Sequence, residues 1–218
     1  KEEKNIMVQN KMITKNVLSL VDSPKQFILA SSVDVYPYSD LPADESTSLG
    51  PISDYGLSKK ESEAECLRWS TQDPKTKLLI LRFSHLYGPA DTNNKMIDTL
   101  VRNAVLGKKS TIYGDGSDKR TYLFVEDAVK AIRLCLRTTE TGIFNVGGSR
   151  AHSVREVMDE IQDLGLKIQK ADVAGKMNSG SSIISSAKAA AKIGFIPTVN
   201  LQQGLRRLLP QNIFIDLD

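Results

Sequence analysis

Tyr55 and Lys59 are four residues apart, a spacing that suits acid/base chemistry. On a helix, residues four apart lie one turn from each other on the same face. A phenol has a pKa of about 10 and is a poor base at neutral pH, but a neighbouring ammonium favours the phenolate and lowers that pKa. A tyrosine tuned in this way can remove a proton from a hydroxyl or return one to a carbonyl. The alternative is a solvated tyrosine and lysine, because the spacing is common by chance.

A continuous apolar run at residues 26–32 lies upstream of this pair and ends in Ser31 and Ser32. Such a run is typical of a buried parallel strand, and open α/β sheets bind ligands beyond the carboxyl ends of their strands. We therefore expect the Ser32 hydroxyl to hold a substrate oxygen. The alternative is a serine that satisfies backbone groups where the strand ends.

Helices and strands alternate along the rest of the chain. The apolar pattern predicts helices at residues 3–21, 54–69, 95–106, 127–137, 186–193 and 201–209, and one that begins at Ser153. It predicts strands at residues 26–32, 77–83, 110–113, 120–125, 143–146 and 167–173, with loops at 37–53 and 84–94. This alternation predicts an α/β fold with a parallel sheet.

Local signals mark two helix starts and one close approach. Ser53 or Asp54 is expected to cap the helix of Tyr55. Ser153, with an acidic residue three positions later, predicts a capping box. Gly56 lies inside a predicted helix, where glycine costs about 1 kcal/mol relative to alanine, so we expect another part of the chain to lie close to its backbone.

Composition excludes several classes of function. The 218 residues carry a net charge of +3 with acidic and basic residues interspersed, so neither nucleic acid nor an anionic membrane is the expected partner. No apolar run approaches the ~20 residues of a membrane span, and no zinc-ligand spacing is present. Cys66 and Cys135 both fall in predicted helices and are expected to stay reduced, which favours a cytoplasmic protein.

Five motifs, the first of which contains Tyr55 and Lys59, give the chain a resemblance to a known family. They are Asp-Tyr-Gly-Leu-Ser-Lys-Lys at 54–60, Leu-Arg-Phe-Ser-His-Leu-Tyr-Gly-Pro at 81–89, Tyr-Gly-Asp-Gly-Ser at 113–117, Phe-Asn-Val-Gly-Gly at 144–148 and Ile-Gly-Phe-Ile-Pro at 193–197. In order and spacing the chain resembles the extended short-chain dehydrogenase/reductases, in the NAD-dependent epimerase/dehydratase branch. The resemblance implies a partial Rossmann-like, doubly wound parallel sheet with a small C-terminal substrate lobe. Residues 1–109 would form the C-terminal half of the NAD(P)-binding domain, with some later segments returning to it, and residues 110–218 would form mostly the substrate lobe.

The resemblance also assigns roles around the cofactor, NAD or NADP. It implies that Tyr55 is the catalytic acid/base, that Lys59 tunes it and binds the nicotinamide ribose, and that Ser32 holds the reacting sugar oxygen. Ser31 and Ser84 would lie against the cofactor.

On the substrate side, Arg120 matches the family arginine that contacts a nucleotide diphosphate, although it could equally be a surface strand arginine. His85 replaces the usual asparagine and can still donate to phosphate, with a charge that depends on pH. Asp34 is either a second acid/base or a loop carboxylate that caps a turn. Dehydratases of the family carry adjacent carboxyls here, and Val33 replaces the first of them, which disfavours an elimination.

Other departures from the family keep three functions open. Thr121 replaces a common aspartate, residues 176–180 lack the usual arginine, and the tail at 212–218 has no counterpart. The first hypothesis is an NAD(P)-dependent nucleotide-sugar epimerase or epimerase/reductase. The others are a non-catalytic NAD(P)-sensing or binding module, and a reductase of a non-nucleotide carbonyl substrate.

The chain opens on a predicted helix and contains no first strand that runs into a Gly-x-x-Gly-x-x-Gly loop. We therefore expect it to be the carboxyl-terminal part of a longer enzyme, and we expect this stretch by itself to be inactive and to bind a dinucleotide weakly. The resemblance further implies a homodimer formed through the helices at 3–21 and 54–69, which would bury Met12, Val17 and parts of the face at 66–69.

Overall fold

The computed structural model describes residues 2–91, 95–170 and 180–210. Its helices are α1 Glu2–Leu20, α2 Asp54–Gln72, α3 Met96–Val105, α4 Val125–Cys135, α5 Val154–Asp163, α6 Ala187–Ile193 and α7 Leu201–Leu208, with a short 3-10 helix, η1, at Val33–Val35. Its strands are β1 Gln26–Ser32, β2 Ser39–Ala43, β3 Lys77–Phe83, β4 His85–Tyr87, β5 Lys109–Ser110, β6 Lys119–Phe124, β7 Gly142–Val146, β8 Ala151–Ser153, β9 Gln169–Lys170 and β10 Ser182–Ile184. No helix within these ranges has the length and apolar character needed to cross a membrane.

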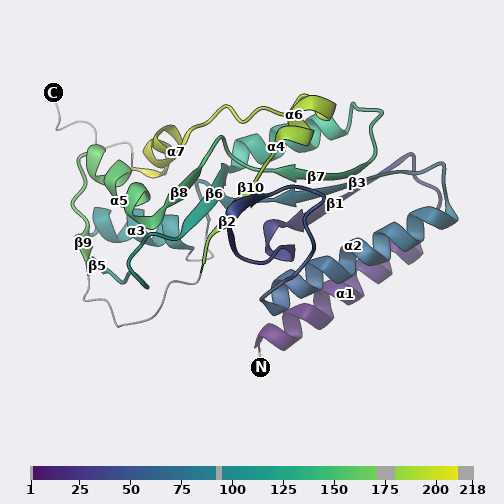
Figure 1. Ribbon diagram of the computed structural model, residues 1–218, viewed down its shortest axis with the longest axis horizontal. Helices are drawn as coiled ribbons and strands as arrows, with labels where there is room; N and C mark the ends of the chain where they lie inside the picture. Colours follow the sequence, from purple (N-terminus) through teal and green to yellow (C-terminus); the bar gives the residue numbers. More distant parts are fainter. Residues whose placement is uncertain (1, 92–94, 171–179, 211–218) are drawn as a thin grey trace.

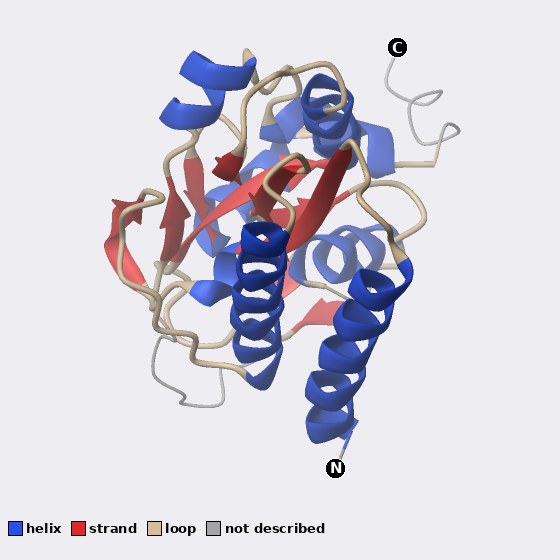
Figure 2. Ribbon diagram, turned by 90° about the vertical axis from the view of Figure 1, so that its right-hand side faces the viewer, coloured by secondary structure: helices blue, strands red, loops and turns tan. Residues whose placement is uncertain are grey.

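A parallel sheet with the order β1-β3-β7 lies between two layers of helices (Figure 1). Helices α1 and α2 cover one face, and α4 and α6 cover the other (Figure 2). The predicted α/β fold with a parallel sheet is therefore confirmed. Strand β7 comes from residues 142–146 but pairs with β3, so a late segment of the chain completes an early sheet.

The alternation of side chains along β3 explains both layers. Leu78 and Ile80 pack against Leu18 of α1 and Cys66 of α2. The intervening residues of β3 point to the opposite face, where they pack against α4 and α6. Successive side chains of a strand point to opposite faces, so an apolar run of this kind is buried on both sides.

Helices α1 and α2 run side by side in the same direction (Figure 1). Asn10 bonds to Ser58 and Thr14 bonds to Ser62, at 3.0 and 2.9 Å, with the same offset of 48 residues. Lys11 forms an ion pair with Glu61 at 3.1 Å along the same seam. The pair leaves an apolar outer row exposed, which comprises Met12, Ile13, Val17, Leu20, Leu57 and Leu67.

The structure modifies two predictions about these elements. Strand β1 is parallel, as expected, but it lies at the edge of the described sheet, and only Ser31 and Ser32 within it are fully buried. A central strand would be buried along its whole length, as β3 is. Cys66 lies on α2 and is completely buried against Leu18, so the exposed part of the predicted dimer face at 66–69 is Leu67 and Arg68, and the dimer itself stays a prediction.

A second sheet supports the other half of the described chain. It has the order β2-β10-β6-β4, and β8 pairs antiparallel with β6. Helices α3, α5 and α7 pack together beside β6 around a core that includes Leu100, Phe124, Ile161 and Leu205. This arrangement places the end of β4 and the start of α3 next to β6, where a cavity opens.

Short strands are where the predicted elements differ from the structure. Strands β2 and β4 fall inside the predicted loops at 37–53 and 84–94, whereas the predicted strand at 110–113 is limited to β5. Strand β10 lies in a serine-rich segment with no strand pattern, and β8 was not predicted. The predicted strand at 167–173 lies partly outside the described residues, which contain β9. These strands are two to five residues long and pair with distant segments, so local sequence carries little of their signal.

Candidate active site

The start of α2 is held against η1, which brings Tyr55 and Lys59 toward the end of β1. Ser53 is the N-cap, and its hydroxyl accepts a hydrogen bond from the Gly56 amide at 3.0 Å. A Cβ atom on Gly56 would overlap the carbonyl oxygen of Asp34. The predicted close approach to this glycine is therefore present, and the partner is the backbone of η1.

Tyr55 lies within reach of both Ser32 and Asp34. Partial burial raises the pKa of Tyr55 above its usual value of 10, the negative charge of Asp34 raises it further, and a hydrogen bond with Ser32 opposes this change. The side chain still keeps 42% of its surface exposed, so a ligand can reach it. The net shift of the Tyr55 pKa is therefore upward in this structure, and the expected lowering by Lys59 stays a prediction.

Lys59 is placed beside the tyrosine ring and below β1. Its Nζ lies 5.7 Å from the ring centroid of Tyr55 and donates to the carbonyl oxygen of Ala30 at 2.9 Å. Burial lowers the pKa of Lys59, and the carboxylate of Glu63 opposes that shift. An ammonium group has three hydrogens, so Lys59 can hold Ala30 and still donate to a ligand.

Ser32 and Asp34 form a compact pair at the end of β1. The Asp34 amide donates to Ser32 Oγ, and Ser32 Oγ donates to Asp34 Oδ2, both at 3.2 Å. Ser32 is thus the residue that caps η1. The Asp34 carboxylate acts electrostatically on Tyr55 on one side and on His85 on the other.

A cavity of about 420 Å³ lies between β4, α3 and β6. Its lining combines apolar and aromatic side chains with a few charged groups, as is usual for small-molecule sites. The lining includes His85, Leu86, Tyr87, Asp91, Lys95, Met96, Asp98, Leu100, Ile112, Tyr113, Asp118, Arg120, Tyr122 and Leu208. The predicted substrate residues His85 and Arg120 are therefore brought together in one cavity.

His85 occupies an unusual place in this cavity. Its Nε2 atom is buried and has no hydrogen-bond partner among the described residues, and the nearby Tyr122 hydroxyl has none either. Burial lowers the pKa of His85 to about 4, Asp34 opposes the shift, and the cations Arg120 and Lys95 reinforce it. His85 is therefore neutral at pH 7 in this structure and keeps one ring nitrogen available for a ligand.

Arg120 is held in place from two sides. One guanidinium nitrogen donates to the carbonyl oxygens of Lys119 at 3.0 Å and Gly180 at 2.6 Å, and the guanidinium lies 5.3 Å from the ring centroid of Tyr38. These contacts fix the direction of the guanidinium beside the cavity.

The two serines assigned to the cofactor differ in their surroundings. The Ser31 hydroxyl donates to Glu63 Oε1 at 2.5 Å inside the protein, so its hydrogen is committed to an internal contact. The Ser84 hydroxyl is buried and has no partner among the described residues, which is the condition expected of a group that awaits a ligand. Lys59 and Ser84 therefore fit a dinucleotide, whereas Ser31 acts within the protein. In the described part of the chain, no three His, Cys, Asp or Glu side chains gather as a metal site requires.

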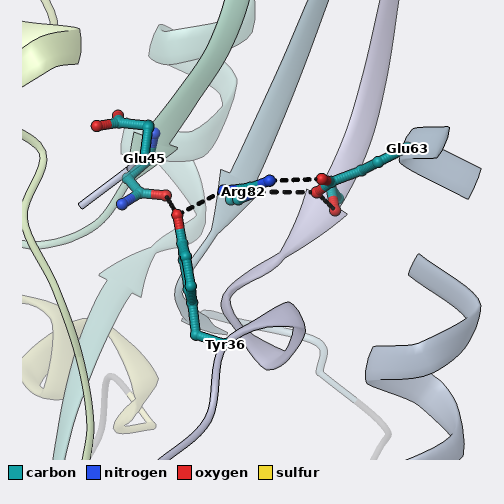
Figure 3. Close-up of polar contacts among 6 residues, drawn as sticks. Tyr36, Glu45, Glu63 and Arg82 are labelled. Atoms are coloured by element: carbon teal, nitrogen blue, oxygen red, sulfur yellow. Dashed lines mark hydrogen bonds and ion pairs between the residues drawn. The ribbon is translucent and has the colours of Figure 1, made fainter. Parts of the chain in front are cut away.

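A buried polar network behind this site was not predicted (Figure 3). Arg82 donates to both carboxylate oxygens of Glu63, at 2.9 and 2.6 Å, and its NH1 donates to the Tyr36 hydroxyl at 2.7 Å. The Tyr36 hydroxyl donates in turn to Asn145 Oδ1 at 2.9 Å. The backbone amide of Asn145 donates to Glu45 Oε1 at 2.7 Å. The network joins β1, η1, α2, β3 and β7.

Two signals in the sequence could have revealed this network. Arg82 is a charge inside a strand that is otherwise apolar, and a buried charge requires a partner. Glu63 follows Lys59 by four residues and Tyr55 by eight, so it lies on the same face of α2 as both.

The fold and the site define an α/β protein with a serine, a tyrosine and a lysine at the end of one strand. A nearby cavity contains His85 and Arg120, the two residues predicted to bind an anion. The sequence profile of the NAD dependent epimerase/dehydratase family matches residues 1–147. The chain therefore belongs to this family.

Individual relatives agree with this assignment. The chain is 31% identical over 189 residues to the Bacillus subtilis (strain 168) protein YtcB, an uncharacterized UDP-glucose epimerase, and the match covers 84% of this chain and 59% of YtcB. It is 29% identical over 195 residues to the dTDP-4-dehydro-6-deoxyglucose reductase of Escherichia coli, with 85% and 60% covered. The chain thus spans about 60% of the length of these relatives.

Solved structures agree on the fold. The UDP-glucuronic acid 4-epimerase from Bacillus cereus, solved with UDP-glucuronic acid and NAD, superposes with a TM-score of 0.83 at 24% identity over 91% of this chain and 65% of that one. The dTDP-glucose 4,6-dehydratase from Bacillus anthracis, solved with NAD, has a TM-score of 0.83 at 27% identity, with 93% and 67% covered.

Proposed function

We propose that the protein is an NAD(P)-dependent nucleotide-sugar epimerase or epimerase/reductase. One observation carries the proposal: Ser32, Tyr55 and Lys59 meet at the end of β1, with Lys59 Nζ 5.7 Å from the Tyr55 ring, and His85 and Arg120 line one cavity. The charge of Asp34 acts on both Tyr55 and His85. A sugar seated at Ser32 and Tyr55 would have its diphosphate in the cavity. The names of the relatives, which refer to UDP-glucose, UDP-glucuronic acid and dTDP sugars, support the same substrate class.

The chemistry would pass through Tyr55. In oxidation of a sugar hydroxyl, the tyrosinate oxygen of Tyr55 would take the hydroxyl proton. NAD or NADP, when bound, supplies the hydride acceptor. Ser32 donates a hydrogen bond to the sugar oxygen, and the Lys59 ammonium favours the tyrosinate. Ser84 and Lys59 are the residues of this chain proposed to hold the nicotinamide half of the cofactor, with Ser31 acting through Glu63 instead.

The subclass follows from the residues beside Ser32. Asp34 is proposed as the second acid/base, because its carboxylate lies next to the Ser32 hydroxyl and acts on Tyr55. Val33 has no proton to transfer, so an elimination of the dehydratase type is disfavoured. Arg120 and His85 are proposed to contact the diphosphate.

A second candidate is a non-catalytic NAD(P)-binding module on the same scaffold. The raised pKa of Tyr55 favours it, because a catalytic base is more effective when its pKa lies near the working pH. A nearby nicotinamide would add positive charge and oppose that rise. The third hypothesis, a reductase of a non-nucleotide carbonyl compound, depends on the segment at 176–180, of which residues 176–179 lie outside the described residues.

Domain roles, assembly and location complete the proposal. Residues 1–109 would serve the NAD(P)-binding domain together with β7, and residues 110–218 would serve mostly the substrate lobe. The exposed apolar row on α1 and α2, which includes Met12 and Val17, supports a homodimer through these two helices. The two free cysteines, Cys66 and Cys135, are compatible with a cytoplasmic protein.

The test uses the protein expressed from its complete coding sequence. It is assayed with NAD(H) and NADP(H) against UDP- and dTDP-sugars, beside the variant Tyr55→Phe. We expect turnover by the wild type and a loss of about 10²-fold to 10⁴-fold in the variant, with cofactor affinity retained. Cofactor binding without turnover of any nucleotide sugar would favour the binding module instead.

A further inference from the structure

We propose that the cavity between β4, α3 and β6 binds the diphosphate of its ligand together with one proton, which His85 takes up from solvent. The inference rests on the proposed function, since it requires a diphosphate in this cavity. It adds a property that the family pattern does not supply, because an asparagine at this position has no proton to gain.

The position of His85 supports the proposal first. His85 lines the cavity from β4, and its buried Nε2 has no partner in the described part of the chain. The ring centroid of Tyr122, on β6, lies 6.1 Å from that of His85, and the Tyr122 hydroxyl is equally unpartnered. Two polar atoms that are buried without partners in one cavity indicate that a ligand with hydrogen-bond acceptors completes the site.

The charges around His85 come from three elements. Asp34, on η1, favours the protonated imidazole, whereas Arg120, on β6, and Lys95, at the start of α3, disfavour it. Asp91, Asp98 and Asp118 also line the cavity. Asp98 faces Arg102 at 3.6 Å, and Asp118 accepts a hydrogen bond from the Gly180 amide at 3.1 Å.

A bound diphosphate changes this balance in a definite direction. Its negative charges offset the repulsion from Arg120 and Lys95, and a phosphate oxygen can accept from Nε2–H, which stabilises the charged imidazole. In the free protein the pKa of His85 lies at about 4, so the imidazole is neutral above that value. Binding raises the pKa, and a proton from solvent is added so that both ring nitrogens carry hydrogen.

The thermodynamic consequence is a pH-dependent affinity. Between the pKa of free His85 and its higher pKa in the complex, each unit fall in pH strengthens binding by up to about tenfold. Above the higher pKa, affinity no longer depends on this residue. A buried imidazole with no diphosphate contact would show no such dependence.

The chain offers a matched control because it contains only two histidines. His152, on β8, is also buried with an unpartnered ring nitrogen, and burial lowers its pKa to about 4 as well. It does not line the cavity. His152, which is buried outside the cavity, can therefore be compared in the same molecule with His85, which is proposed to donate to a phosphate oxygen.

The experiment is calorimetric titration of UDP-glucose and dTDP-glucose into the protein from its complete coding sequence, saturated with NAD. Titrations at about pH 6 in buffers of different ionisation enthalpy measure the number of protons taken up. A diphosphate esterified at both ends does not titrate near this pH, so uptake reports on the protein. The wild type, His85→Asn and His152→Asn are compared.

We expect the wild type and His152→Asn to take up most of one proton, and His85→Asn to bind without measurable uptake. Binding by the wild type without uptake, or equal uptake by His85→Asn, overturns the inference and leaves the proposed function intact. If neither nucleotide sugar binds to the wild type, the inference and the proposed substrate class fail together.

Discussion

Arg82 and Glu63 form a doubly hydrogen-bonded ion pair in which the side chains keep only 3% and 2% of their surface exposed. Arg82 belongs to β3, and Glu63 lies four residues after Lys59 on α2. The carboxylate also accepts from Ser31, and Arg82 donates to Tyr36. The pair therefore ties α2 to the sheet, one turn after Lys59, through side chains that are buried inside the protein.

Breaking this pair should destabilise the protein strongly. We expect Arg82→Met to lower the free energy of unfolding by about 3–5 kcal/mol, because Glu63 is left as a buried charge without its partner. The double variant Glu63→Gln/Arg82→Met should lose less than the sum of the single variants. Urea unfolding curves give the three values. The control is Lys11→Met, which breaks an exposed ion pair with Glu61 and should cost less than about 1 kcal/mol. A loss in Arg82→Met no greater than in Lys11→Met would contradict the expectation.

Replacing Gly56 with alanine should displace the start of α2. The added Cβ would meet the carbonyl oxygen of Asp34, which belongs to the backbone and cannot rotate away. We expect a loss of about 1–3 kcal/mol in the free energy of unfolding and a lower kcat, because Tyr55 moves away from Ser32. Urea unfolding and steady-state kinetics measure both. Gly50→Ala, where the added Cβ would meet only the Pro37 side chain at ordinary contact distance, is the control and should change either quantity little. Alanine at 56 with unchanged kcat and stability would show that the helix start is free to shift.

The position of Tyr55 and Lys59 followed from sequence because helix spacing is a local property. The long apolar strands β1 and β3 and the capping box at Ser153 were predictable for the same reason. Gly56 was informative because glycine in a helix has a cost that needs a compensating contact.

Properties set by distant segments were not predictable in this way. The pKa of Tyr55 shifts upward because burial and Asp34 act on it, and burial depends on how α2, η1 and β1 meet in space. Strand β10 consists of Ser182, Ile183 and Ile184, which pair with β2 and β6, two strands far away in the sequence. The environment of Ser31 likewise depends on Glu63, which follows it by 32 residues in the sequence and accepts its hydroxyl hydrogen.

The capping box of α5 should give the protein a measurable pH dependence. Hydrogen bonding from the Ser153 amide, helped by Arg150, holds the pKa of Glu156 at about 2, below its reference value of 4.5. A carboxyl whose pKa is depressed in the folded state stabilises the protein above the unfolded value, and this contribution disappears as pH falls from about 4.5 through about 2. The side chain is 41% exposed, so screening reduces the effect to about 1 kcal/mol.

Urea unfolding of the wild type and Glu156→Gln at about pH 7 and pH 3 measures this contribution. We expect the wild type to be more stable at pH 7 and the difference to shrink at pH 3. Asp159→Asn changes net charge equally from the exposed face of α5 and is the control. A wild-type advantage that stayed constant across this pH range would rule out the carboxylate as its source.

Removing the charge of Asp34 should move the pH profile of the reaction. The negative carboxylate raises the pKa of Tyr55, so Asp34→Asn should lower that pKa. A tyrosine that acts as base must lose its proton, and kcat/KM for sugar oxidation rises with pH through its pKa. The rising limb should therefore shift to lower pH in Asp34→Asn. Asp54→Asn removes an equal charge beside Tyr55 and tests whether any nearby carboxylate suffices, since Asp54 is not among the groups that shift this pKa. If the rising limb stays in place or moves to higher pH in Asp34→Asn, Asp34 does not set the basicity of Tyr55. If kcat also falls by about 10²-fold or more alongside the shift, Asp34 is itself a proton-transfer group.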